Sequence, residues 1–182
     1  MIVWGGDDNV ATIYNSGSRY NPSTDTWAAT ATTGAPTARG GHVAVWTGSR
    51  MVIWGGRDVT TFFNTGSRYD PVANTWAATT TTGAPAGRWQ ATAVWTGTAM
   101  IVWGGTSDGS NYLTGGARYN PSSNTWAPMS AMNQPSRRAF PSAYWDGFYL
   151  AVWAARSAPT RPPTPRSPTA RATAPTSTPG PR

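Results

Sequence analysis

The feature that most constrains this chain is an internal repeat of about fifty residues. Tryptophans recur at positions 4, 54, 103 and 153, and Arg-Tyr pairs recur at positions 19/20, 68/69 and 118/119. Two further tryptophan sets share the period, at positions 27, 76 and 126 and at positions 46, 95 and 145. A fixed period of this length is typical of folds in which one supersecondary unit is stacked several times.

Within one repeat the sequence pattern predicts four short strands. Residues 42–56 read HVAVWTGSRMVIWGG, which is two runs rich in valine, isoleucine and tryptophan joined by a glycine-containing turn. The segments NTGSRYDP and NTWAATT predict a third and a fourth strand, separated at a proline that cannot donate to a ladder. No segment shows a sustained helical period. The repeat is therefore predicted to be a four-stranded antiparallel sheet, and radial stacking of such sheets gives a β-propeller.

The repeat resembles a known family. A Gly-Gly pair that closes the second strand, followed by a tyrosine and then a tryptophan, resembles the Kelch repeat. The segments RYNPSTDTW and IVWGG are more closely similar to the bacterial Kelch type grouped with the central domain of galactose oxidase. The resemblance covers residues 1 to about 153 and implies a propeller. Relatives of this type are commonly secreted, so it also implies an extracellular or cell-envelope location, although no signal peptide is visible.

Comparison of the strands with the Kelch blade predicts an open arc and not a closed ring. Residues 1–30 supply three strands, residues 37–80 and 86–130 two whole blades, and residues 139–153 the first two strands of another. Propellers close with about four to eight blades, so we expect the chain to be a fragment of a longer protein. Uncovered sheet faces and strand edges at both ends of the arc favour self-association.

Residues 154–182 have a different composition. They are rich in proline and arginine and contain neither an aromatic residue nor an aliphatic residue larger than alanine. Such a segment cannot bury enough apolar surface to offset its ordering entropy, so we expect a disordered tail. Earlier repeats read Trp-Gly-Gly where this one reads Trp153-Ala-Ala, a change that loss of one G from GC-rich codons produces. The tail is interpreted either as a natural Pro-rich linker or as the product of a frame slip at Trp153.

The net charge of +7 comes mainly from this tail. Five arginines and no acidic residue follow Trp153, so residues 1–153 carry nine arginines against seven aspartates. A nucleic-acid-binding surface needs a basic patch on the folded part of the protein. The nearly neutral repeats therefore argue against nucleic acid as a partner. No run approaches the roughly 18 apolar residues of a membrane-spanning helix.

The resemblance to galactose oxidase raises the question of copper chemistry. That enzyme holds copper through histidine and tyrosine ligands, one tyrosine being cross-linked to a cysteine, whereas this chain has no cysteine and one histidine. We therefore exclude that mechanism, and the same shortage of ligands argues against a zinc site. No cofactor or metal is expected, because the loop aspartates and the Gly-Gly pairs do not match a calcium or a phosphate motif.

An arginine recurs three residues after a proline at the entry to each innermost strand, as Arg39, Arg88 and Arg138. In the Kelch architecture this connection opens onto the mouth of the channel. The resemblance thus implies a rim of guanidinium groups that could bind carboxylates or hydroxyl-rich sugars. The alternative is structural, in that each arginine hydrogen-bonds to backbone carbonyls of the neighbouring blade.

His42 and Trp89 complete the predicted ligand-binding set at the rim. His42 lies four residues before Trp46, at the start of an inner strand. A hydrogen-bonded polar residue is the favoured interpretation over a general base, because the sequence places no acidic residue near it. Trp89 is the one tryptophan outside the repeat positions.

The loops that follow the Gly-Gly strands point to the function. They read DDNVATIY, RDVTTFF and TSDGSNYL, and so differ in every repeat while their flanks recur. Variable loops on a rigid frame are where recognition usually takes place. The sequence therefore predicts a non-catalytic module that binds a protein or a glycan. The alternative is a sugar-modifying enzyme resembling the Kelch-type sialic-acid mutarotases, and the absence of glutamate argues against it.

Overall fold

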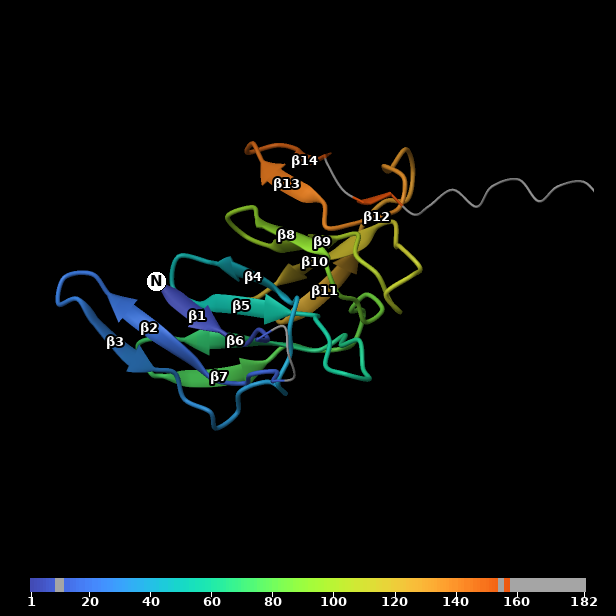
Figure 1. The fold of residues 1–182 in the computed structure, drawn as a ribbon. Helices are drawn as coiled ribbons and strands as arrows, with labels where there is room; N and C mark the ends of the chain where they lie inside the picture. Colours follow the sequence, from blue (N-terminus) through green and yellow to red (C-terminus); the bar gives the residue numbers. More distant parts are fainter. Residues whose placement is uncertain (9–11, 154–155, 158–182) are drawn as a thin grey trace, which may run out of the picture.

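The computed structural model describes residues 1–8, 12–153 and 156–157, which form strands, turns and loops (Figure 1). The first three repeats each fold into one antiparallel sheet and the fourth into two smaller ones, and together the sheets form an open arc that does not close into a ring. The predicted fold class, an all-β propeller fragment that forms an open arc, is thereby confirmed. The described part of the chain has no helix that could span a membrane.

The first three sheets, which we call blades 1, 2 and 3, are simple meanders in which each strand pairs with the next one. Blade 1 has three strands: β1 (Ile2–Trp4), β2 (Gly17–Asn21) and β3 (Thr26–Ala29). Blade 2 has four: β4 (Val43–Trp46), β5 (Met51–Trp54), β6 (Gly66–Asp70) and β7 (Thr75–Ala78). Blade 3 also has four: β8 (Thr92–Trp95), β9 (Met100–Trp103), β10 (Gly116–Asn120) and β11 (Thr125–Pro128). The inner strands of neighbouring blades, β4 with β8 and β8 with β13, contact one another.

Blade 4 consists of two smaller sheets. β13 (Ser142–Trp145) pairs with β14 (Leu150–Trp153), and β12 (Arg138–Ala139) pairs with β15 (Arg156–Ser157). The sequence predicts disorder from residue 154, whereas β15 lies inside that segment and is paired. A backbone ladder needs no apolar side chain, which is why composition alone did not indicate this strand. The predictions of a disordered tail and of a frame slip otherwise concern residues 154–155 and 158–182. These residues lie outside the described part of the chain.

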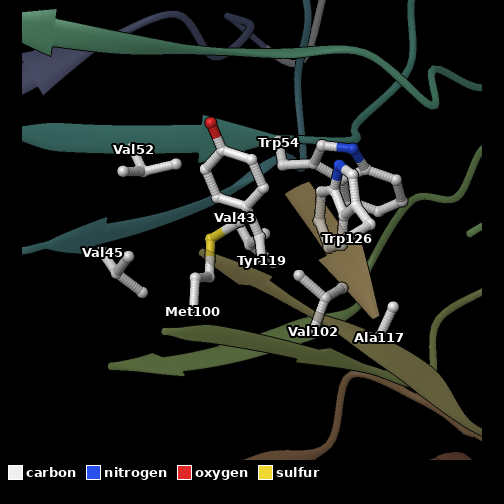
Figure 2. Packing of buried hydrophobic residues seen from close by; sticks show 9 residues of the cluster. All are labelled: Val43, Val45, Val52, Trp54, Met100, Val102, Ala117, Tyr119 and Trp126. Atoms are coloured by element: carbon white, nitrogen blue, oxygen red, sulfur yellow. The ribbon is translucent and has the colours of Figure 1, made fainter. Parts of the chain in front are cut away.

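The core lies between the blades. The middle strands β5 and β9 are buried along their whole length because a neighbouring blade covers each face, which explains why both read as continuous apolar runs. Figure 2 shows the cluster between blades 2 and 3, in which the indoles of Trp54 and Trp126 meet edge to face with ring centroids 5.3 Å apart. The cluster contains Val43, Val45, Val52, Trp54, Met100, Val102, Ala117, Tyr119 and Trp126.

The Arg-Tyr and Asn-Thr-Trp motifs join each blade to the preceding one. In blade 3 the Tyr119 hydroxyl donates to Asn124 Oδ1 at 2.7 Å, and that oxygen also accepts from the backbone N–H of Thr80 in blade 2 at 3.0 Å. The Trp126 indole N–H donates to the Thr80 carbonyl at 3.0 Å. Asn124 has a φ of 54°, a left-handed conformation that asparagine tolerates well. Equivalent bonds join blade 2 to blade 1, so these recurring residues hold the arc together.

The Gly-Gly pair is explained by close backbone packing. Gly55 and Gly56 have φ values of 73° and 86°, in the region that favours glycine. A Cβ at Gly55 would lie 2.9 Å from the Arg88 carbonyl oxygen, and one at Gly56 would lie 2.8 Å from that of Gly40. The loop after β5 thus passes directly against the connections that enter β4 and β8.

Candidate binding site at the blade rim

All five residues predicted for the ligand site lie at one end of the blades, which we call the rim. The rim is formed by the loops that follow β1, β5 and β9 and by the connections that enter β4, β8 and β13. Backbone hydrogen bonds link these two groups of segments, as between Gly56 N and Arg88 O at 2.8 Å. The opposite end of the blades carries the tight turns between β4 and β5 and between β6 and β7, and we call it the turn end.

The guanidinium of Arg39 lies inside the protein. Arg39 is 1% exposed, and its Nη1 donates to the carbonyls of Gly55 at 3.0 Å and of Thr65 at 2.9 Å. Its Nε donates to the Thr37 carbonyl at 3.0 Å, and its Nη2 contacts the Thr65 hydroxyl at 3.1 Å. Burial lowers its pKa to about 10, which the charge of Asp58 partly opposes. Arg39 therefore stays charged at neutral pH and directs its donors into the blade.

Arg88 repeats this arrangement in blade 3. It is 6% exposed, and its Nη1 donates to the carbonyls of Gly104 at 3.0 Å and of Gly115 at 3.2 Å. Its Nε donates to the Ala86 carbonyl at 3.1 Å, and burial lowers its pKa to about 10. A planar group with several donors is suited to gathering carbonyls from two segments of a loop.

The two arginines connect neighbouring blades through both backbone and side chain. The backbone N–H of Arg39 donates to Tyr14 O of blade 1 at 3.3 Å, and its carbonyl accepts from Gly6 N at 2.9 Å, while its guanidinium binds its own blade 2. The sequence left open a structural role in which each arginine side chain bonds to carbonyls of the neighbouring blade. In the structure the side chain bonds to carbonyls of its own blade, and the backbone of the arginine makes the bonds to the neighbouring one. Ligand binding by Arg39 and Arg88 stays a prediction, to which their buried donors give no support.

Arg138 occupies the same position in the fourth repeat and is partly exposed. Its Nε donates to the Ser136 carbonyl at 3.1 Å and its Nη2 contacts the Ser136 hydroxyl at 3.1 Å. Arg39 and Arg88 each bind the carbonyl sixteen residues further along the chain. The corresponding residue for Arg138 is position 154, outside the described residues. A ligand-binding role for Arg138 also stays a prediction.

His42 lies beneath the rim, against Trp4. The two rings meet edge to face with centroids 5.5 Å apart. Burial, and secondly the positive charge of Arg39, lower the pKa of His42 from 6.5 to about 4, although a hydrogen bond to the Arg39 backbone partly opposes the shift. The imidazole is therefore neutral at neutral pH and too weak a base for efficient proton transfer there.

Trp89 is the predicted residue that lines a pocket on the surface. Its indole rests against Gly41 of blade 2, where a Cβ would overlap the ring. The guanidinium carbon of Arg57 lies 4.1 Å from the centre of the Trp89 ring, in a cation–π contact. Phe140 of blade 4 also meets Trp89 edge to face, with ring centroids 6.1 Å apart. Trp89 of blade 3 thus contacts both Arg57 of blade 2 and Phe140 of blade 4.

The rim pocket has a volume of about 440 Å³ and is lined by Trp89, Gln90, Gly109, Tyr112 and Phe140. Phe140 is 53% exposed and has a φ of 51°. A left-handed backbone conformation is uncommon for a bulky residue. Its amide nevertheless donates to Gln90 O at 3.0 Å, which fixes the backbone at this point. The pocket therefore combines three aromatic side chains with a locally constrained backbone.

A family model of Kelch repeats, described as the KLHDC2/KLHL20/DRC7 Kelch-repeats domain, matches residues 1–154. The chain belongs to the Kelch-repeat family. The match includes all four blades from β1 to β14 and both the arginines and the aromatic pocket. No curated protein matches the chain at a significant level. The closer similarity to the bacterial galactose oxidase-like Kelch type stays a prediction.

Sequence reasoning named Trp89 of the five residues that line the pocket of this Kelch chain and included Gly109 and Tyr112 in the variable loop TSDGSNYL, but it missed Gln90 and Phe140. The available signal was variation between repeats, because the position of Gly41 in blade 2 is Gln90 in blade 3 and Phe140 in blade 4. All three have positive φ values, 59°, 57° and 51°. This left-handed position is therefore a glycine in blade 2, a glutamine in blade 3 and a phenylalanine in blade 4.

The described residues of this Kelch chain contain no group of three or more His, Cys, Asp or Glu side chains that could hold a metal ion. The candidate site is thus built from aromatic rings, one amide and a neighbouring guanidinium.

Proposed function

We propose that this Kelch chain is a non-catalytic module that binds a protein partner at the rim, with the aromatic pocket as its anchor site. Kelch repeats commonly serve protein interactions. The observation that carries the proposal is Phe140, a half-exposed phenylalanine in a left-handed conformation. The left-handed backbone recurs at Gly41 and Gln90, so the unusual feature is a large, half-exposed ring at a position where glycine causes least strain. Residues that keep such strain are typically found at functional sites.

The chemistry of the pocket favours a large apolar side chain of the partner as the inserted group. Trp89, Tyr112 and Phe140 offer ring faces and edges, and aromatic anchors in such pockets contribute most of the binding energy in many interfaces. Arg57 covers one face of Trp89 and disfavours a cationic group nearby. An acidic residue next to the inserted side chain would complement Arg57 and increase the association rate.

The buried arginines support this role by holding the rim in place. Arg88 directly precedes Trp89, and its guanidinium is bound to the carbonyls of Gly104 and Gly115 on either side of the loop that contains Tyr112. A site held in its binding conformation pays less ordering entropy when the partner docks.

The enzymatic alternative, a mutarotase-like activity on a sugar, would need an arginine with free donors opposed to a carboxylate. Arg39 and Arg88 direct their donors to backbone carbonyls instead. This weighs against the enzyme and in favour of a binding module.

The proposal can be tested with peptides selected by phage display against the full chain. Affinities of the enriched peptides would be measured by fluorescence polarisation for the wild type and for Phe140→Gly and Trp89→Ala. Blade 2 has Gly41 at the position of Phe140, and blade 4 has Ala139 at the position of Trp89, so both substitutions introduce residues that the repeat already contains.

We expect both substitutions to weaken binding at least about tenfold, as loss of an anchor aromatic usually does. Val72→Ala, at an exposed residue of the turn end, is the matched control and should leave affinity unchanged. Peptides that bind the wild type and Phe140→Gly equally well would contradict the proposal.

A further inference from the structure

The three recurring tryptophan sets of this chain differ in how far packing accounts for them. In the first set, Trp54 is fully buried, and in the second, Trp126 packs against it. The third set, Trp46, Trp95 and Trp145, ends the inner strands at the turn end, and even Trp95, which lies in a complete blade with a neighbour on each side, is only partly buried. Packing between blades therefore does not fully explain why this position is tryptophan in every repeat.

Trp95 is supported on one side and open on the other. It packs against the cluster between blades 2 and 3, and it also lines a groove of about 380 Å³ at the turn end. We call this the turn groove. Its other walls include Ser49, Thr98, Asn120 and Ser122, together with Arg50. An indole held by the core beside a row of polar side chains is a platform on which a flat ligand can stack.

The polar groups of the groove are short hydroxyls and an amide. Asn120 Oδ1 accepts from the backbone N–H groups of Ser122 at 2.9 Å and Ser123 at 3.3 Å. These bonds orient the amide, so its NH₂ group supplies the donors for a ligand. Ser49, Thr98 and Ser122 are exposed and carry hydroxyls that can both donate and accept.

The charge of the groove is neutralised within blade 2. Arg50 is the charged side chain that lines the groove, and its Nε lies 3.5 Å from Asp70 Oδ2. A charged ligand would compete with this ion pair or meet an uncompensated charge. A neutral ligand with many hydroxyls is the better match.

We propose that the turn groove binds a pyranose unit of a neutral oligosaccharide. The C–H face of the sugar ring would stack on Trp95, and its hydroxyls would bond to Asn120 and the neighbouring serine and threonine hydroxyls. The volume lies within the range of about 300 to 1,000 Å³ that is typical of small-molecule sites. The groove lies at the opposite end of the blades from the rim pocket, so this inference does not rest on the proposed protein binding.

The polar lining belongs to one junction and not to the repeat. The pocket beside Trp46, between blades 1 and 2, is lined mainly by apolar residues, among them Met1, Ile2 and Met51, together with Arg19 and Tyr20. The tryptophan recurs at both junctions, whereas the serine and threonine hydroxyls and the amide line the groove between blades 2 and 3. The turn groove between blades 2 and 3 is therefore the junction suited to a sugar.

The test uses the full chain and a panel of neutral glucose, galactose, xylose and N-acetylglucosamine oligosaccharides, with sialylated and uronic-acid oligosaccharides as acidic comparators. Binding would be measured by isothermal titration calorimetry. Trp95→Phe shortens the platform while keeping an aromatic ring on the core. Ser122→Val removes a hydroxyl and introduces the residue that blade 2 has at this turn position, Val72, so folding should be retained.

We expect at least one neutral oligosaccharide to bind, and each substitution to weaken binding by up to about tenfold, through loss of aromatic contact area at Trp95 or of one hydrogen bond at Ser122. Phe140→Gly at the rim should leave sugar binding unchanged. The inference is overturned if no neutral member of the panel binds, if acidic members bind preferentially, or if affinity survives both groove substitutions. Loss of peptide binding by Phe140→Gly with sugar binding intact would separate the two sites.

Discussion

Lowering the pH from 7 to 4.5 is expected to destabilise this Kelch chain through His42. The pKa of His42 is lowered from an ordinary value of 6.5 to about 4, mainly by burial and secondly by Arg39. Between these values the unfolded chain binds a proton that the folded chain does not. The stability contributed by the neutral imidazole is therefore complete above pH 6.5 and is lost as the pH falls towards 4.

The size of the effect follows from the difference in pKa. One pKa unit corresponds to about 1.4 kcal/mol, so the shift predicts a loss of about 2.5 kcal/mol by pH 4.5. Carboxylates contribute little in this window, because their ordinary pKa is 3.8 and that of several is lower still. Asp58, Asp70, Asp108 and Asp146 all accept backbone N–H bonds, which lower their pKa.

Urea unfolding followed by circular dichroism at pH 7.5, 6.0, 5.0 and 4.5 would measure this loss. His42→Ala is the matched variant, since blade 3 has Ala91 at the same position. Its free energy of unfolding should be nearly constant over the same pH range. The reasoning is refuted if the wild type is equally stable at pH 7.5 and 4.5, or if His42→Ala loses stability to the same extent.

Three further predictions follow from the blades. Arg88→Ala should lower the free energy of unfolding by about 3 kcal/mol or more, because it leaves buried carbonyls without a donor, whereas Arg118→Ala at an exposed position should change it by less than about 0.5 kcal/mol in the same urea assay. Phe140→Gly should stay within about 1 kcal/mol of the wild type by urea unfolding, since relief of the left-handed conformation offsets the lost contact with Trp89. The full chain should self-associate in sedimentation velocity, and a concentration-independent monomer would contradict this. Large apolar side chains are exposed at both ends of the arc: Val3, Trp27, Tyr144 and Trp153.

The fold could be predicted because the same contact recurs in each blade. Trp76 and Trp126 lie at one repeat position, and each donates its indole N–H to a carbonyl of the preceding blade. A residue that makes an equivalent contact every fifty residues leaves a periodic trace in the sequence. The strand pattern within one repeat adds the pairing order, so fold class and blade order follow from local information.

The direction of a side chain does not follow from its period. Arg39 and Arg88 recur as regularly as the tryptophans, but whether they face a ligand or the blade depends on the path of the loop after β5 or β9. That path is set by Gly-Gly pairs packed against the neighbouring connection, a contact between segments far apart in the chain. Position in the repeat was predictable for these arginines, and burial was not.

Binding residues are therefore best sought at two kinds of position: those where the residue type differs between repeats, and those where a recurring residue is only partly buried. Phe140 is of the first kind, because blade 2 has glycine at this left-handed position and blade 4 has a half-exposed aromatic ring. Trp95 is of the second kind, because it recurs but keeps one side open to a groove. A residue that served packing alone would be small at the position of Phe140 and fully buried at the position of Trp95. The rim pocket is lined by residues of blades 3 and 4 and the turn groove by residues of blades 2 and 3, so substitutions that change binding without changing stability should concentrate at these two junctions, at opposite ends of the blades.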